Sequence, residues 1–197
     1  MLCLLNLRAT ATADELSPPD EGFSANTLFE HGRYEGGLSS GVMFSPFIAT
    51  HLRPTINYTI TAVQFGYMLS NVKGSGCLRG NFELAGEGFG SAIFDGAGSY
   101  IAGCTVWGRY NFVPAHSRFV PFGQIGLGLT STDIDHKIVG QPFNFNIDVG
   151  LGTRYFLSEK WALTLEYRYQ HISNANSGRH NLGINAHGPL LGVAYLF

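Results

Sequence analysis

The chain has 197 residues, of which 13% are charged and 45% hydrophobic, and its formal net charge is −2 with histidine neutral. This length suits one domain, and the hydrophobic content argues against a disordered chain. The charged residues are scattered without a basic stripe, which argues against nucleic acid as a partner. The 26 glycines and 15 phenylalanines are an excess that suits closely packed strands with aromatic side chains at a membrane interface.

The first residues resemble the end of a leader. An apolar start at 1–5 and small residues at 11–13 precede Asp14, which predicts a truncated secretory signal peptide over residues 1–13. The basic segment that opens a full signal peptide is missing. No apolar run approaches the roughly 20 residues that a transmembrane helix needs.

Apolar and polar residues then alternate with a period of two in recurring runs, with Gly, Pro, Asn or Ser between them. The clearest run is 143–155, which has apolar residues at most odd positions and amides, a carboxylate, glycines and a guanidinium at even ones. Alternate residues of a strand point to opposite faces, so each run predicts a strand with one apolar face. In chain order the predicted strands are about 36–47, 55–70, 76–93, 99–113, 118–131, 142–157, 161–173 and 186–197.

The polar faces of these strands carry charges of both signs, as the packed interior of a small membrane barrel does. The residues concerned are Arg79, Asn81, Glu83, Arg109, Asn111, Asp148, Arg154, Glu166 and Arg168. Links near 72–74, 114–116 and 157–160 are short, whereas 131–141 and 174–185 are long, as expected for the two ends of such a barrel. The sequence therefore predicts an all-β fold, an eight-stranded antiparallel transmembrane β-barrel, as a single domain over residues 14–197.

The last residues, 191–197, alternate and end on Phe197. This pattern resembles the terminal signal by which outer-membrane barrels are recognised, so we expect the barrel assembly machinery to be a partner during biogenesis. A soluble lipocalin-like or sandwich protein, with the apolar face inside, is the competing fold. The sequence leaves open whether the barrel forms a homodimer.

The cysteines give no evidence of a metal site. Cys3 falls in the predicted leader, and Cys77 and Cys104 lie near opposite ends of neighbouring predicted strands, so we expect no disulfide between them. Neither has a histidine or a second cysteine at ligand spacing. We expect no metal and no cofactor.

The predicted strand 161–173 carries the side chains best suited to catalysis. Its apolar positions, continued along the strand, place His171 and Ser173 together on the outward face. Two residues so spaced can come within hydrogen-bonding reach, which is what a histidine base and a serine nucleophile need. Because this face of a barrel meets the bilayer, a site at the strand end would meet lipid.

The segments EYRYQHISNA (166–175) and NLGIN (181–185) resemble the carboxy-terminal signature of the lipid A 3-O-deacylase family. The resemblance implies a barrel in the outer membrane of a Gram-negative bacterium that removes the ester-linked 3-hydroxyacyl chain at position 3 of lipid A, so that lipid A or lipopolysaccharide is the partner. It assigns the role of base to His171 and that of nucleophile to Ser173.

One position departs from the family pattern. Asn185 stands where the best-known form has an acid. An amide can accept a hydrogen bond from the imidazole and hold its tautomer, as in Cys–His–Asn sites, but it stabilises an imidazolium less well than a carboxylate. Asp133 and Asp135, in a neighbouring long link, are possible substitutes for the missing acid, but nothing in the sequence supports them. The alternation of the predicted strand points Glu166 inward. A non-catalytic barrel, structural or adhesive, in which Asn185 marks lost activity, is therefore the alternative function.

The tetrahedral intermediate of an esterase needs hydrogen-bond donors for its oxyanion. Asn174 and Asn181, both at family positions, are the candidates, helped by backbone amides near Ala175 and Gly183; turn formation is the competing explanation of both asparagines. His180, His187 and Arg179 could bind a headgroup phosphate, but solvated loop side chains explain them more simply.

Overall fold

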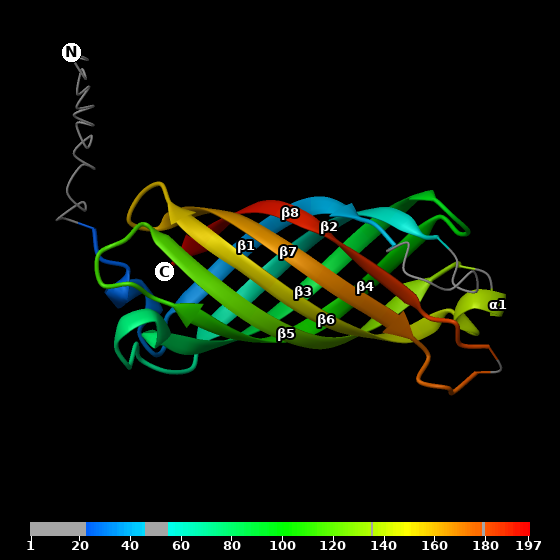
Figure 1. Cartoon of the computed structure of the whole chain (residues 1–197), viewed down its shortest axis with the longest axis horizontal. Helices are drawn as coiled ribbons and strands as arrows, with labels where there is room; N and C mark the ends of the chain where they lie inside the picture. The colour runs from blue at the N-terminus through cyan, green and yellow to red at the C-terminus, as the bar shows by residue number, and fades with distance from the viewer. Residues whose placement is uncertain (1–22, 46–54, 135, 179) are drawn as a thin grey trace, which may run out of the picture.

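The computed structural model describes residues 23–45, 55–134, 136–178 and 180–197, and these form one closed antiparallel barrel (Figure 1). The strands are β1 (Tyr34–Met43), β2 (Asn57–Met68), β3 (Gly80–Asp95), β4 (Tyr100–Phe112), β5 (Phe119–Thr132), β6 (Phe143–Phe156), β7 (Trp161–Ser173) and β8 (Ile184–Leu196). Each strand pairs with the next, and β1 closes the barrel against β8. The predicted eight-stranded antiparallel barrel is confirmed.

Within the described ranges, three short helices lie outside the strands: η1 (Asn26–Phe29), η2 (Gly76–Leu78) and α1 (His136–Val139). Figure 1 shows the C-terminus at one end of the barrel, beside the first described residues, and α1 at the other end, beside the link from β7 to β8. These are named the η1 end and the α1 end below. The predicted leader, 1–13, lies outside the described residues.

Strand boundaries agree with the predictions to within two residues, except at two places. β1 ends at Met43, and beyond it Phe44 makes only an isolated bridge with His187. β3 starts at Gly80 instead of 76, because Gly74 and Gly76 adopt left-handed φ values of 85° and 59° that break an extended strand.

The late start of β3 corrects two expectations. Arg79 lies in the link before β3 and not on the polar face of a strand, and its Nη2 donates to Asn26 Oδ1 at 2.7 Å. The η1-end link 69–79 is longer than predicted, whereas the link 96–99 at the α1 end is short. The two ends therefore differ less in link length than the sequence suggests.

The outer wall is apolar and has aromatic rings near the η1 end. Leu127, Leu151 and Val63 are each more than 60% exposed on it. At the η1 end the ring of Tyr34 contacts those of Phe65 and Phe197, with centroids 5.5 and 5.8 Å apart. An apolar band flanked by aromatic residues is the surface that a membrane barrel presents to lipid. It excludes the soluble fold, whose apolar faces would point inward.

No helix within the described residues is both long and apolar enough to span a membrane. Cys77, in η2, and Cys104, in β4 opposite Gly88, are both exposed free thiols.

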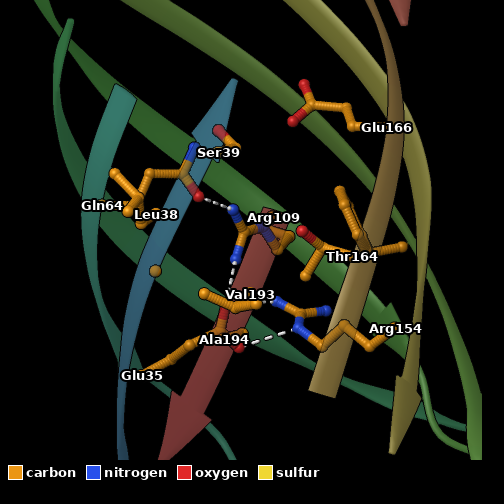
Figure 2. Close-up of a pocket in the computed structure, with 12 residues that line it drawn as sticks. Glu35, Leu38, Ser39, Gln64, Arg109, Arg154, Thr164, Glu166, Val193 and Ala194 are labelled. Atoms are coloured by element: carbon orange, nitrogen blue, oxygen red, sulfur yellow. Dashed lines mark hydrogen bonds and ion pairs between the residues drawn. The ribbon is translucent and has the colours of Figure 1, made fainter. Parts of the chain in front are cut away.

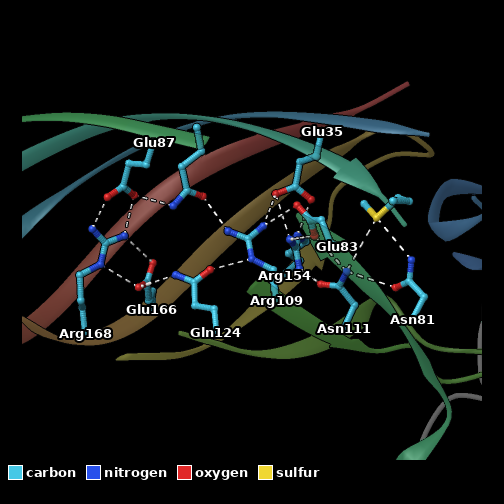
Figure 3. A network of polar contacts seen from close by, with 12 residues as sticks. Glu35, Asn81, Glu83, Glu87, Arg109, Asn111, Gln124, Arg154, Glu166 and Arg168 are labelled. Carbon is cyan, nitrogen blue, oxygen red and sulfur yellow. Dashed lines mark hydrogen bonds and ion pairs between the residues drawn. The ribbon is translucent and has the colours of Figure 1, made fainter. Parts of the chain in front are cut away.

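The middle of the lumen holds a network of ion pairs (Figure 3). Arg109 pairs with Glu35 and Glu83 at 3.1 and 2.9 Å, and Arg154 Nε lies 2.8 Å from Glu35 Oε2. Further along the row, Arg168 lies 2.7 Å from Glu87 and 2.9 Å from Glu166. Because each guanidinium meets two carboxylates, the buried charges compensate one another. The polar interior is confirmed, and Glu35 and Glu87 add to it.

Apolar clusters close both ends of this network. Phe29, Val120 and Phe156 belong to the cluster at the η1 end, and Ile60 and Ile172 to the cluster at the α1 end. A cavity beside the network, lined by residues such as Arg109, Thr164 and Ala194 (Figure 2), measures about 20 Å³, enough for a single water. It is far too small for an acyl chain, so this cavity is not a site for a lipid.

Candidate active site on the outer wall

The β7–β8 hairpin sets which side chains face outward. Its register pairs His171 with Asn185 and Ile172 with Ile184. Both isoleucines are buried in the cluster at the α1 end, so the alternation turns His171, Ser173 and Asn185 to the outer wall. The three side chains are half-buried there.

His171 and Asn185 are hydrogen-bonded. Asn185 Oδ1 lies 2.6 Å from His171 Nδ1 and also accepts a hydrogen bond from the Tyr169 hydroxyl at 2.8 Å. A carbonyl oxygen can only accept, so the imidazole carries its proton on Nδ1 and leaves Nε2 free to accept one. This is the tautomer that a general base at Nε2 requires.

Ser173 and the His171 ring both lie close to Gly183. Gly183, with a φ of 68°, lies beside both: a Cβ built there would stand 3.3 Å from His171 Cε1 and 3.7 Å from Ser173 Cβ. In the part of the chain that the structure describes, the Ser173 hydroxyl makes no hydrogen bond. Catalytic hydrogen bonds often form only in the substrate complex. The absence of a hydrogen bond between the Ser173 hydroxyl and His171 here is therefore compatible with a catalytic pair.

Asn174 and Asn181 are bound into the β7–β8 link. Asn174 is fully buried, and its Nδ2 donates to the carbonyls of Val139 and His180 at 2.9 and 2.8 Å. Its backbone N–H donates to Asn181 Oδ1 at 3.2 Å, while Asn181 Nδ2 donates to Asn176 Oδ1 at 3.0 Å. The donors of Asn174 thus hold the link in place, whereas that of Asn181 serves one exposed amide.

Two neighbouring residues of the link have unusual backbone angles. Ala175 and Asn176 have left-handed φ values of 51° and 61°. This conformation costs alanine about 1–2 kcal/mol, whereas asparagine tolerates it. Within the described residues, the backbone N–H groups of both have no hydrogen-bond acceptor. They are therefore available to a ligand at the Ser173 end of β7.

Residues 138–141, which are called the α1 segment below, pack against the same link. Leu182 N donates to Ile138 O at 2.9 Å, and Gln141 Nε2 donates to Ser177 Oγ at 3.1 Å. Gly140, at a φ of 74°, lies so close to His180 and Asn174 that a Cβ would collide with both. No pattern in the sequence indicated that residues 138–141 support the candidate site.

The remaining candidates lie elsewhere. Asp133 accepts hydrogen bonds from the Ser99 hydroxyl and from the backbone N–H groups of Ser99 and Tyr100, and these bonds lower the pKa of Asp133 to about 2. It is thus engaged with the β3–β4 link and not with His171. Glu166 points into the lumen, as expected from parity.

The histidines and the residues outside the described ranges complete the list. The ring of His187 faces outward and is hydrogen-bonded to the Tyr167 hydroxyl, while His180 is exposed in the link. Asp135 and Arg179 lie outside the described residues. Among those that are described, no cluster of three or more His, Cys, Asp or Glu side chains could hold a metal ion.

The surroundings of Ser173 are apolar. Its partner on β6 is Phe145, and Phe143 and Ile147 flank this residue on the same outer face. All three are exposed on the outer wall, as is Leu182 beside Gly183. A ligand that reaches the hydroxyl must therefore lie against hydrocarbon, which suits an acyl chain.

Comparison with known proteins gives a family and several structural relatives. The family model of lipid A 3-O-deacylase (PagL) matches residues 78–194. The crystal structure of the outer membrane enzyme PagL aligns with a TM-score of 0.56 and 14% identity over 80% of this chain and 97% of that one. Neisserial surface protein A (NspA) aligns with a TM-score of 0.57 and 14% identity, over 84% of this chain and 97% of that one.

The N-terminal β-barrel domain of Pseudomonas aeruginosa OprF has a TM-score of 0.54 and 16% identity, over 85% of this chain and 98% of that domain. None of the curated proteins matches. At these identities the structures show a shared fold alone, and that fold serves both an enzyme and a surface protein.

The family model is more specific than the fold. It covers more than half of the chain and includes the hairpin that joins His171 to Asn185. This protein is an outer-membrane β-barrel that belongs to the lipid A 3-O-deacylase (PagL) family.

Proposed function

We propose that the protein is a serine esterase that hydrolyses the ester-linked 3-hydroxyacyl chain at position 3 of lipid A in the outer leaflet. The observation that carries the proposal is the hydrogen bond between His171 and Asn185 on the lipid-facing wall, with Ser173 two residues further along the same outer face. Family membership supplies the substrate. The apolar wall around Ser173 supports an acyl chain as the group that is bound.

In the proposed mechanism the Ser173 oxygen attacks the ester carbonyl and transfers its proton to His171 Nε2. Asn185 Oδ1 holds the Nδ1–H of the resulting imidazolium. The tetrahedral intermediate then expels the sugar oxygen, which takes the proton from Nε2, and an acyl-enzyme remains. Water then attacks this ester while His171 Nε2 takes a proton from it, and the second tetrahedral intermediate expels the Ser173 oxygen, which takes that proton from Nε2 as the fatty acid is released.

The oxyanion would be bound by donors of the β7–β8 link. Asn181 Nδ2 would have to break only its hydrogen bond to the exposed Asn176 Oδ1. The backbone N–H groups of Ala175 and Asn176 have no acceptor within the described chain. Asn174 could contribute its side chain only by exchanging its bonds to Val139 and His180. Asn181 is therefore the stronger of the two predicted candidates.

A non-catalytic barrel is the second candidate function. It is favoured by the neutral amide at Asn185 and by the Ser173 hydroxyl, which has no hydrogen bond to His171 among the described residues. The deciding property is ester hydrolysis by the intact, inserted barrel.

The test is mass spectrometry of lipid A from Gram-negative cells that express the wild type or Ser173→Ala. We expect the wild type to remove one 3-hydroxyacyl chain and Ser173→Ala to leave lipid A intact. Ser131→Ala, on the outer face of β5 at the same end of the barrel, is the matched control and should behave as the wild type. Heat-modifiable gel mobility reports correct insertion. An unchanged acyl pattern with inserted wild type would sink the enzymatic proposal and favour the inert barrel.

A further inference from the structure

Tyr169 shares the acceptor of the catalytic histidine. It lies two residues before His171 on the outer face of β7, and its hydroxyl reaches diagonally to Asn185 on β8. The two donors stand 2.8 and 2.6 Å from the same oxygen, Asn185 Oδ1. An amide oxygen has two lone pairs, so both are in use.

The shared acceptor matters because a carboxamide carries an acceptor, the oxygen, on one side and a donor, the NH₂ group, on the other. If the Asn185 amide turned by half a rotation, Nδ2 would donate to His171 Nδ1. The imidazole proton would then move to Nε2, and the base would be lost. A carboxylate in this position would present an oxygen in either orientation.

The Tyr169 hydroxyl opposes that rotation. It could accept a hydrogen bond from the rotated Nδ2, but its own hydrogen would then have no acceptor among the described residues. The wall around it faces lipid, where a polar hydrogen without a partner is costly. The orientation with the oxygen toward both donors is thus the one that satisfies Tyr169 and His171 together.

We propose that Tyr169 is a positioning residue, whose hydroxyl keeps the Asn185 oxygen turned toward His171 and so maintains the proton on Nδ1. The inference rests on the proposed esterase function for its kinetic consequence. Its structural consequence, the tautomer of His171, holds whether or not the barrel is an enzyme.

The neighbouring Tyr167 provides a matched control. It lies two residues earlier on the same face of β7, and its hydroxyl is bound to His187 instead of Asn185. Tyr167→Phe removes the same atom from the same wall, about 7 Å further along the strand. It leaves the contacts of Asn185 intact.

The kinetic experiment measures hydrolysis of purified lipid A by the full-length barrel in detergent micelles. Loss of one net hydrogen bond predicts that Tyr169→Phe lowers kcat by about three- to tenfold with little change in KM, whereas Tyr167→Phe retains the wild-type kcat. In an Asn185→Asp background the loss caused by Tyr169→Phe should shrink to less than about twofold, because either carboxylate oxygen serves His171. An unchanged kcat in Tyr169→Phe, or an equal loss in both backgrounds, would overturn the positioning role.

A second readout does not need activity. The imidazole ¹⁵N shifts of His171, assigned by comparison with His171→Gln, should show the Nδ1–H tautomer in the wild type and in Tyr167→Phe, and a new Nε2–H population in Tyr169→Phe. If Tyr169→Phe leaves the tautomer unchanged, the inference is wrong. If the tautomer shifts as expected but neither wild type nor Ser173→Ala hydrolyses lipid A, it is the proposed function that has failed.

Discussion

At the scale of single residues, Asn185 is the centre of the candidate site because two donors depend on its oxygen. Replacing it by leucine, of similar size, leaves His171 Nδ1–H and the Tyr169 hydroxyl without an acceptor on a lipid-facing wall. We expect Asn185→Leu to lower kcat at least about tenfold, since each unsatisfied donor costs about 1–3 kcal/mol.

The companion variant Asn185→Glu restores the acid of the family pattern and should maintain or raise kcat, because a carboxylate stabilises the imidazolium better than an amide. Steady-state hydrolysis of lipid A by both variants tests the pair. A large loss of activity in Asn185→Glu would show that the position has another role.

Gly183 lies close to the proposed catalytic pair, His171 and Ser173. In Gly183→Ala the new methyl group would stand 3.2 Å from the Ile172 carbonyl oxygen and 3.3 Å from His171 Cε1, at a φ of 68° that alanine rarely adopts. Because the backbone oxygen cannot move easily, the imidazole would have to shift. We expect about a tenfold fall in kcat, because small misplacements of a base are costly. Gly76→Ala controls for the backbone strain alone, since its φ is 59° and nothing lies within 4 Å of the added Cβ. Equal activity of both variants would show that the space beside His171 is not needed.

Sequence parity was enough to place His171, Ser173 and Asn185 on one face, because alternation is a local property of a strand. It could not reveal the bond from Tyr169 to Asn185, which depends on the register between β7 and β8. The space left by Gly183 was equally hidden, since the sequence suggested only a backbone donor there.

At the scale of elements, the candidate site depends on two links that are far apart in the chain. The α1 segment supports the β7–β8 link through Asn174, Leu182 and Gln141. The sequence predicted both as long links but could not show that they touch. It also placed the start of β3 too early, because the left-handed turn at Gly74 and Gly76 is set by backbone angles that alternation does not encode.

Gly140→Ala tests this support. The added methyl group would collide with the His180 carbonyl and the Asn174 amide, at a φ of 74°, so we expect the two links to separate and activity to fall about tenfold or more. The barrel itself should insert normally, because its strand ladder does not involve Gly140. Limited proteolysis of the intact barrel should cut the links sooner than in Gly32→Ala, a left-handed glycine with open space around it. Wild-type cleavage and activity would argue against a supporting role for α1.

In the barrel as a whole, the lumen holds the buried ion pairs and the outer wall holds the candidate site. The alternation predicted the polar interior, but Glu35 fell before the predicted first strand and was missed. Its partners, Arg109 and Arg154, come from β4 and β6. Pairing across a closed barrel joins residues distant in sequence, so composition and parity could predict a charged lumen but not which charges meet.

Arg154→Ala tests the ion pairs. It leaves Glu35 and Glu83 with Arg109 as their shared cation, and breaking such buried pairs typically costs about 3–5 kcal/mol. We expect a lower urea midpoint of unfolding in lipid vesicles, whereas the exposed Arg33→Ala should unfold as the wild type does. An unchanged midpoint in Arg154→Ala would mean that the network adds little to stability.

If the lipid-facing Ser173 is the nucleophile, a long-chain alkyl fluorophosphonate should modify its hydroxyl covalently. Intact mass and peptide mapping of the inserted barrel should show one phosphonyl adduct on Ser173 in the wild type, and none in His171→Gln, which lacks the base. Labelling at another residue, or no labelling of a correctly inserted wild-type barrel, would contradict the account.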